Sequence, residues 1–530
     1  MQTAACAGMT LLLAVVHAAN AATPAPINPF LAPSNYPLPH RSSAQQDSTP
    51  IAGPRGASRA LEAGEIDYVQ LGPAHFGAFT SGPYPDGRRV LWSNGVNGIY
   101  KVDHDTFKVL AQLPPPQGVR ADDASRADAA IAAFDRSNDG FLALLRAMRE
   151  AQVLRDLSGV YTLVDRDNRF YVGEKAGAIL AYGDREPGRA ESPIELQGRY
   201  DFPAAVTGPL MGINMTFDGW LVVATEHGYV VLVSRDLKHS HVIRLRHADA
   251  VKHESSRTGY GWVRNSFAVD EAGGIYIASR EHLHKVVWTG ARLSLDEADG
   301  AWVEPYSNTT GEGTGSTPAL MGFGDGDRFV VITDGDVLMN VTLLWRDRVP
   351  ADWPGLPGLS RRVAGRQPAR MGKLDLKAIQ SEQAVVVAGY GALVVNNQPR
   401  NEPWYLPRRA NRLLVSYLGS NPRHQPFGVQ KFEWDPQARQ LREAWVNESV
   451  SSPNCVPMVS TGSGLAYLIG ARDNRWTLEA LDWVTGASAF HHVIGGQRYN
   501  SLFAGTLIDE AGRVVYGTSF GRVRLRPGAP

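Results

Sequence analysis

The sequence predicts an all-β protein built as a ring of repeated blades, a β-propeller of eight blades, with seven as the alternative. The 530 residues include 54 glycines and 34 prolines, and this composition favours short strands and tight turns over long helices. Strand–turn–strand patterns recur along the chain at a spacing of roughly fifty residues, which is typical of propeller blades. No single blade buries both of its faces, so the blades must stack in a ring.

Eight predicted hairpins carry this repeat. Each has two apolar strands around a turn, usually rich in Gly and Asp, as in NMTFDGWLVVATEHG (214–228) and NSFAVDEAGGIYIASREHL (265–283). The hairpins are centred on residues 84–92, 162–174, 215–226, 267–279, 319–334, 385–397, 459–470 and 506–519. A pair of β-sandwiches or a β-helix would explain the even spacing less well.

The last repeat has only three strands before the chain stops at Pro530. We expect the segment EIDYVQL (65–71) to supply its missing outer strand. The N-terminal part of the chain would then close the ring and cover an open sheet edge.

The first residues resemble a signal peptide, predicted over 1–21. MTLLLAVV (9–16) is a short apolar run, and ANA (19–21) has small residues at a cleavage spacing, although no Lys or Arg precedes the run. The run is too short to span a bilayer. We therefore expect a periplasmic or secreted protein with no integral membrane segment in the mature chain.

Residues 22–64 are rich in Pro, Ala and Ser and are predicted to form an extended arm. The arm could be pinned to the globular body by Phe30, Leu31 and Tyr36, or it could be disordered; both alternatives stay open. The propeller is predicted to span 65–530. Three insertions interrupt the repeat. A helical insertion with two helices is predicted at 120–157, and loop insertions are predicted at 350–380 and 398–411.

Charge and cysteine content exclude several classes of function. Fifty-three basic residues balance fifty-three acidic ones, so nothing indicates a nucleic acid or an anionic membrane surface as a partner. Cys455 is left alone once Cys6 is removed with the signal peptide. We expect it to be a packed core residue rather than a nucleophile.

Three short motifs have simple structural interpretations. DRSNDG (135–140) resembles the start of a calcium-binding EF-hand loop, but Arg146 stands at the twelfth position, where calcium needs a carboxylate, so a turn between two helices is predicted. ALDWVTGASAF (480–490) resembles the blade signature of pyrroloquinoline-quinone dehydrogenases, although Phe490 replaces a Trp, and we expect a turn between outer strands. The His-x-His pairs at 239–241 and 282–284 could face a metal, but with no third ligand fixed by spacing, surface histidines are the expected role.

Polar residues are predicted to gather at one mouth of the channel. In an antiparallel hairpin the start of the first strand and the end of the second lie on the same face. Asn214 and Asn265 are predicted at strand starts. The strand ends carry Glu226, His227, Arg280 and Asp334. The turn residues Asp165, Asp218, Asp270 and Asp509 should lie on the opposite face and serve only the turns.

Asn265-x-x-x-x-Asp270-x-x-Gly273 resembles a blade element of the gluconolactonase, strictosidine synthase and paraoxonase superfamily, and Asn214-x-x-x-Asp218-Gly219 is a shorter version. The resemblance implies a calcium ion at the channel mouth that polarises a lactone or ester. Its ligand candidates here are Asn214, Asn265 and Asp334. Calcium favours such carboxylate and amide oxygens, and an open cation acts as a Lewis acid.

The expected function is therefore calcium-assisted hydrolysis of a small lactone or ester. Glu226 and His227 are the acid–base candidates, and Arg280 is the candidate for stabilising an anion. Three alternatives remain open. The asparagines could simply cap strands, the protein could be a non-enzymatic scaffold for a protein or glycan partner, or it could be a quinone-dependent oxidoreductase.

Overall fold

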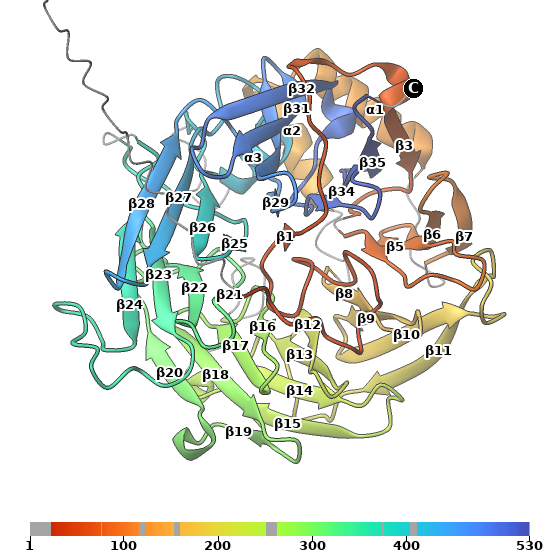
Figure 1. The fold of residues 1–530 in the computed structure, drawn as a ribbon. Helices are drawn as coiled ribbons and strands as arrows, with labels where there is room; N and C mark the ends of the chain where they lie inside the picture. The colour runs from red at the N-terminus through yellow and green to blue at the C-terminus, as the bar shows by residue number, and fades with distance from the viewer. Residues whose placement is uncertain are drawn as a thin grey trace, which may run out of the picture.

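The structure is a computed structural model that describes residues 23–75, 77–115, 123–152, 160–250, 262–372, 376–402 and 411–528. Eight sheets surround a central axis (Figure 1), and each contains a four-stranded antiparallel meander. The prediction of an eight-bladed propeller is confirmed. The predicted signal peptide, residues 1–21, lies outside the described residues.

The eight predicted hairpins are the two innermost strands of the eight blades. In chain order the blades are β4–β7 (Phe79–Thr80, Val90–Gly95, Gly98–Asp103, Val109–Leu113), β8–β11 (Thr162–Val164, Phe170–Glu174, Ala178–Asp184, Ile194–Asp201), β12–β15 (Leu210–Met215, Leu221–Thr225, Tyr229–Val233, Ser240–Arg244), β16–β20 (Ala268–Val269, Gly274–Ala278, His282–Trp288, Leu293–Ser294, Trp302–Pro305), β21–β24 (Ala319–Met321, Phe329–Thr333, Asn340–Trp345, Val363–Pro368), β25–β28 (Val386–Ala388, Gly391–Val395, Val429–Asp435, Gln440–Asn447), β29–β32 (Met458–Ser460, Leu465–Arg472, Arg475–Asp482, Ser488–Gly495) and β33–β35 (Leu507–Ile508, Val514–Gly517, Gly521–Leu525).

The eighth blade is completed from the N-terminal side of the chain. Strand β3 (Ile66–Gln70) pairs antiparallel with β35, from Ile66 opposite Leu525 to Gln70 opposite Gly521. The predicted closing strand is thus confirmed. The expectation for 350–380 needs correction, because part of it is not an insertion. Residues 363–368 form β24, the outer strand of a blade, with Ala364 buried in the core between neighbouring blades.

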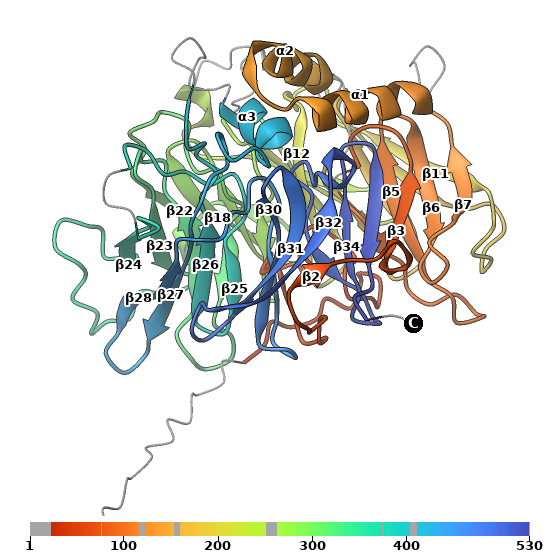
Figure 2. The ribbon, with the colours of Figure 1, turned by 90° about the horizontal axis from the view of Figure 1, so that it is seen from above.

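Helices lie on one face of the disc (Figure 2). They are α1 (Ala124–Arg136), α2 (Gly140–Ala151) and α3 (Asn411–Leu418). The link between α1 and α2 is a turn, as predicted, because the Arg146 guanidinium donates to the carbonyls of Ala133 and Ser137. Within the described residues, no helix combines the length and the apolar character that crossing a membrane requires.

The N-terminal arm runs through the middle of the ring, where Figure 1 shows it in red. It contacts the innermost strand of every blade. Arm carbonyls accept from six blades through backbone amides, in the bonds Thr80 N to Tyr36 O, Val164 N to Pro37 O, Val269 N to Ser43 O, Leu320 N to Ala44 O, Val387 N to Gln46 O and Val459 N to Asp47 O. Ser43 O accepts from Val269 N and from the Asn214 side chain, and the Asn35 side chain donates to Ile508 O.

The arm is therefore pinned rather than disordered. Leu31 and Tyr36 are 5% and 3% exposed, and the guanidinium of Arg166 lies 4.4 Å from the centre of the Phe30 ring. Two short arm strands extend one blade, since β1 (Ser48–Thr49) pairs with β29 and β2 (Arg59–Ala60) pairs with β32.

Deleting residues 23–49 is expected to abolish cooperative folding. Each strand amide that loses its arm carbonyl without a replacement costs about 1–3 kcal/mol, and together these losses approach or exceed a typical total stability of about 5–15 kcal/mol. Thermal unfolding followed by circular dichroism checks this. Deletion of residues 23–27, which are mostly exposed, is the control and should leave the melting temperature within a few degrees. An unchanged melting curve in the larger deletion would contradict the role of the arm.

The ring closure contains a buried histidine. His104, in the turn after β6, has Nε2 3.0 Å from Glu510 Oε2 and 3.6 Å from Asp509 Oδ2, in the turn between β33 and β34. Its Nδ1 lies 3.0 Å from Asp105 Oδ1. Burial by itself lowers the pKa of His104, but these three carboxylates outweigh it and the pKa is raised. Glu510 also accepts from the Asn35 amide at 2.8 Å, so one cluster joins the first blade, the last blade and the arm.

This cluster predicts pH-dependent stability. The folded pKa of His104 lies above its unfolded value of about 6.5, so the stabilisation is complete below the unfolded pKa and is lost as the pH rises through the folded pKa. Arg513 Nη2 also lies 3.0 Å from Nδ1, and the pKa of His104 is raised in its presence. The gap in melting temperature between wild type and His104→Gln should be wider near about pH 6 than near about pH 9. A gap that widens as pH rises would show the sign to be wrong.

Candidate functional site in the central cavity

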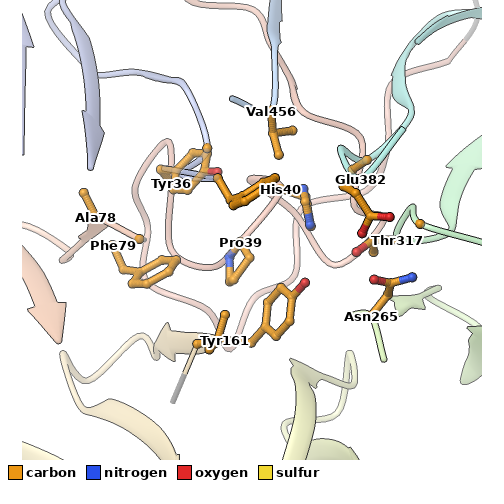
Figure 3. Close-up of a pocket in the computed structure, with 16 residues that line it drawn as sticks. Tyr36, Pro39, His40, Ala78, Phe79, Tyr161, Asn265, Thr317, Glu382 and Val456 are labelled. Atoms are coloured by element: carbon orange, nitrogen blue, oxygen red, sulfur yellow. The ribbon is translucent and has the colours of Figure 1, made fainter. Parts of the chain in front are cut away.

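A cavity of about 280 Å³ lies on the propeller axis, between the arm and the segments that lead into the inner strands. Figure 3 shows the side chains that line it. The arm supplies Tyr36, Pro39 and His40, and the blades supply Gly77, Ala78, Phe79, Val160, Tyr161, Asn265, Gly315, Thr317, Glu382, Ala384, Val456, Phe503 and Gly505. The cavity is thus walled by seven of the eight blades and floored by the arm.

A buried histidine–aspartate pair forms the floor. His40 Nδ1 lies 2.7 Å from Asp47 Oδ2, and the two residues are 7% and 0% exposed. Burial raises the pKa of Asp47, and His40 opposes that rise. The arm turns back on itself between them, with left-handed φ angles of 59° at His40, 72° at Arg41, 58° at Gln45 and 51° at Asp47. Such conformations are costly for residues other than glycine and tend to occur at functional sites.

The pair sets the chemistry of the imidazole. When Asp47 is ionised, its carboxylate only accepts hydrogen bonds, so Nδ1 then carries the proton and Nε2 presents its lone pair. Nε2 is buried and has no hydrogen-bond partner among the described residues. His40 lines the cavity, although its Nε2 atom is itself closed off from solvent.

The opposite side of the cavity is polar. The Asn265 amide nitrogen donates to Thr314 O at 3.0 Å and to Ser316 O at 3.2 Å. Glu382 Oε1 lies 3.5 Å from the guanidinium of Arg264.

Tyr161 adds a neutral hydroxyl to this side. Burial raises its pKa, and hydrogen bonds from Thr317 and Ser266 and the charge of Arg264 oppose the rise. The phenol therefore stays protonated at neutral pH and can donate.

Of the three predicted metal ligands, only Asn265 reaches the cavity. Asn214 was predicted to start its strand, and this prediction is wrong. Asn214 lies near the end of β12, opposite Val222. Its Nδ2 donates to Ser43 O at 3.1 Å and to Phe267 O at 2.8 Å, and it is fully buried against the arm.

The geometry of the turns explains this error. In both turns one backbone amide donates to the carbonyl four residues later. The donors are Thr216, which bonds to Trp220 O, and Asp270, which bonds to Gly274 O. Thr216 and Asp270 therefore occupy equivalent positions. The sequence comparison had instead matched Asp218 with Asp270. Counted from the turn, Asn214 corresponds to Ala268 and not to Asn265.

The predicted turn role is confirmed at Asp165, Asp270 and Asp509, but it is not their only role, because Oδ2 of each also contacts a residue outside the turn: Arg235, Tyr276 and His104 respectively. In each, Oδ1 accepts from the backbone amides two and four residues later. Asp218 differs, because it accepts from Thr216 Oγ1 and from Trp288 Nε1.

The remaining predicted residues lie outside the cavity lining. Glu226 is 5% exposed; burial raises its pKa, and the charges of Arg280 and Lys175 oppose this. His227 Nδ1 lies 2.9 Å from Thr207 Oγ1. Glu226, His227 and Arg280 are not among the residues that line the cavity.

Asp334 is committed to its own turn. Oδ1 accepts from the Asn340 amide at 2.8 Å, and Oδ2 accepts from the Asn340 side chain at 2.6 Å and from Arg366 at 2.9 Å. The described residues contain no group of three or more His, Cys, Asp or Glu side chains that could hold a metal. Of the three candidate ligands, Asn265 alone lines the cavity, and the calcium site stays a prediction.

The other motifs have structural roles. The His241 ring packs 4.9 Å from Trp288. The expectation of a surface histidine is wrong for His284, which is buried with Nε2 2.9 Å from Ser279 Oγ. Asp482 accepts from the amides of Val484 and Thr485, which makes the predicted turn between β31 and β32.

Cys455 is fully buried, as expected. Burial raises the pKa of its thiol to about 12.

His40 and Asp47 were not predicted as site residues, nor were Tyr161, Thr317 and Glu382. One signal for the first two exists in the sequence. HRSSAQQD (40–47) is a polar run inside an otherwise Pro- and Ala-rich arm.

No model of a known protein family matches the chain. Among solved structures, the quinohemoprotein alcohol dehydrogenase ADHIIG from Pseudomonas putida HK5 is similar with a TM-score of 0.50 and 12% identity, covering 94% of this chain and 81% of that one. The quinohemoprotein alcohol dehydrogenase from Comamonas testosteroni has a TM-score of 0.48 and 13% identity, with 96% and 82% covered. At these identities the likeness concerns the fold alone.

The protein is thus an eight-bladed β-propeller with an arm-floored central cavity. An uncharacterized protein from Archaeoglobus fulgidus is 33% identical to it over 513 residues, which cover 94% of this chain and 90% of that protein. The chain belongs to the same family as this archaeal protein.

The two asparagines should differ in their effect on stability. Asn214→Ala removes buried bonds to two carbonyls and is expected to lower the free energy of unfolding by about 2–3 kcal/mol. Asn265→Ala borders the cavity, where water can replace the amide, and should cost less than about 1 kcal/mol. Urea unfolding of both variants, with chelator or with calcium, measures this. If calcium stabilises the wild type and Asn265→Ala abolishes that effect, the predicted calcium site stands instead.

Proposed function

We propose that this protein is an exported enzyme that acts on a small organic molecule in its central cavity, with His40 as the general base. The reaction that we propose is hydrolysis of an ester or lactone. One observation carries the proposal: His40 lines the cavity, its imidazole is held by buried Asp47, and its buried Nε2 has no hydrogen-bond partner among the described residues. Nε2 has to be exposed by a shift of the ring or the arm before it can act.

The chemistry follows from these groups. A water molecule that gives a proton to His40 Nε2 can form a bond to the substrate carbonyl carbon. Asp47 stabilises the imidazolium that results and keeps its orientation. The Tyr161 hydroxyl can donate to the developing oxyanion. When the bond to the leaving oxygen breaks, the imidazolium returns its proton to that oxygen. This assignment moves the acid–base role from Glu226 and His227 at the rim to His40 in the cavity.

A second candidate function has one observation in its favour. The outer face of α2 exposes Leu142, Leu145 and Met148 by 73%, 44% and 45%. An exposed apolar patch of this kind suits a protein partner, so a non-enzymatic scaffold remains the second proposal. The quinone-dependent oxidoreductase has no such support from the described residues.

The enzyme is tested with a panel of small esters and lactones on the wild type, His40→Asn and Asp47→Asn. Loss of the base should lower kcat by roughly 10²–10⁴-fold. Asp47→Asn keeps the shape but changes the hydrogen bond that fixes the imidazole tautomer, so it should also lower kcat. Circular dichroism confirms that each variant is folded.

His492→Asn is the matched control, because His492 is 1% exposed and lies in β32, away from the cavity. It should keep the wild-type kcat. If the His40 variant is folded and as active as the wild type, His40 is not the base. If the wild type hydrolyses no member of the panel, the scaffold becomes the leading proposal.

A further inference from the structure

We infer that the central cavity recognises an uncharged single-ring carbonyl compound, whose carbonyl oxygen accepts from Tyr161 and whose own O–H or N–H group donates to Asn265. This inference deepens the proposed function by naming the class of substrate, and it rests on that proposed function. A lactone that carries a hydroxyl group on its ring belongs to this class.

The volume of the cavity limits the ligand to one ring. An engineered protein cavity of about 150 Å³ takes up benzene, with its six carbon atoms. By the same ratio, the 280 Å³ of this cavity accommodate roughly ten non-hydrogen atoms. That is one six-membered ring with a short substituent.

One side of the cavity is apolar. Figure 3 places Ala78 and Phe79 across the cavity from Glu382 and Asn265. Tyr36 is stacked on Phe79, with ring centres 6.2 Å apart. Aromatic rings bury a large apolar area and pack on other rings at such distances, so this side fits the ring of a ligand.

The opposite side offers one donor and one acceptor. The Tyr161 oxygen accepts from the Thr317 hydroxyl and from the Ser266 amide, so its own proton is left to donate to a ligand. The Asn265 amide nitrogen donates to two backbone carbonyls, and Figure 3 shows the amide oxygen directed toward the cavity. A ligand that fits both groups accepts from Tyr161 and donates to Asn265. Because the proposed reaction takes place at a carbonyl, the carbonyl oxygen is the accepting group.

The charges around the cavity oppose one another. Glu382 is the one Asp or Glu among the described lining residues, and its Oε1 lies 3.5 Å from the guanidinium of Arg264. Burial raises the pKa of the Tyr36 phenol; the charge of Asp47 adds to this rise, and that of Arg522 opposes it. Neither sign of charge therefore dominates the lining.

This balance favours an uncharged ligand. An ion of either sign would lose its hydration in the cavity without meeting a surplus of the opposite charge, which is costly. Tyr36 and Tyr161 both stay protonated at neutral pH, because burial raises the pKa of each phenol. They add polar groups to the lining without adding charge.

Four probes of nearly equal size and shape test charge and hydrogen bonding separately. Benzamide is uncharged and has a carbonyl and an N–H donor, acetophenone lacks the donor, benzoate is an anion and benzamidine is a cation. Binding to the full chain is followed by calorimetry and by the rise in melting temperature that mass action produces. Benzamide should bind most tightly, and both ions should bind at least about tenfold more weakly.

Two variants test the two hydrogen bonds. Tyr161→Phe removes the donor and should weaken both benzamide and acetophenone by about three- to tenfold. Asn265→Ala removes the acceptor and should weaken benzamide by a similar factor, but should change acetophenone by less than about twofold, because acetophenone has no proton to donate. Tyr390→Phe is the matched control, since Tyr390 donates to Asp327 O and is not part of the lining. It should leave all four affinities unchanged.

Three results would each overturn the inference: an ion that binds as tightly as benzamide, an unchanged benzamide affinity in Tyr161→Phe or Asn265→Ala, or no binding of any probe. Its failure is distinguishable from that of the proposed function. His40→Asn should bind benzamide within about threefold of the wild type even though it loses hydrolysis, because the recognition contacts come from other residues. A wild type that hydrolyses charged esters as fast as uncharged ones would overturn the inference and leave the proposed function intact.

Discussion

The structure depends on the hydrogen bonds between the N-terminal arm and the innermost strands of all eight blades. An innermost strand has one edge paired within its blade and another edge facing the channel, and its free amides need partners. Here arm carbonyls accept from Val164, Val269, Leu320, Val387 and Val459. A Pro-rich segment suits this task, because proline keeps its carbonyl but brings no N–H that would need a partner in the channel.

The same constraint generates the His40–Asp47 pair. Between Ser43 and Asp47 the arm bonds to five successive blades within five residues. To follow the small circle at the axis the backbone must curl tightly, and it does so through left-handed conformations at Gln45 and Asp47 as well as at His40. The curl brings Asp47 back to His40. The candidate base and its orienting carboxylate are therefore a consequence of how the arm passes the blades.

The sequence predicted those parts of the fold whose signals are local. The hairpins and the closing strand at 65–71 carry alternating apolar residues and turn chemistry, which can be recognised without knowing their partners. The path of the arm has no such signal, because Asp47 and Val459 are far apart in the chain. The prediction of the candidate site was wrong at Asn214 for a related reason. Aligning Asn214 with Asn265 ignored that Thr216, not Asp218, occupies the equivalent turn position, and a shift along a strand changes which residues reach the axis.

Stability and function are coupled in this arrangement. Residues of the arm and β3 find their partners in β29, β33 and β35, near the other end of the chain. Contacts of such long sequence separation form late, because loop closure has to be completed first. Until they form, the cavity has no floor and His40 is not held by Asp47 at the axis. A propeller that is open at its last blade would keep most of its sheets and still lack the site. Assembly of the ring is thus the step that would create the proposed base, and the arm that carries His40 is also the segment that holds the ring closed.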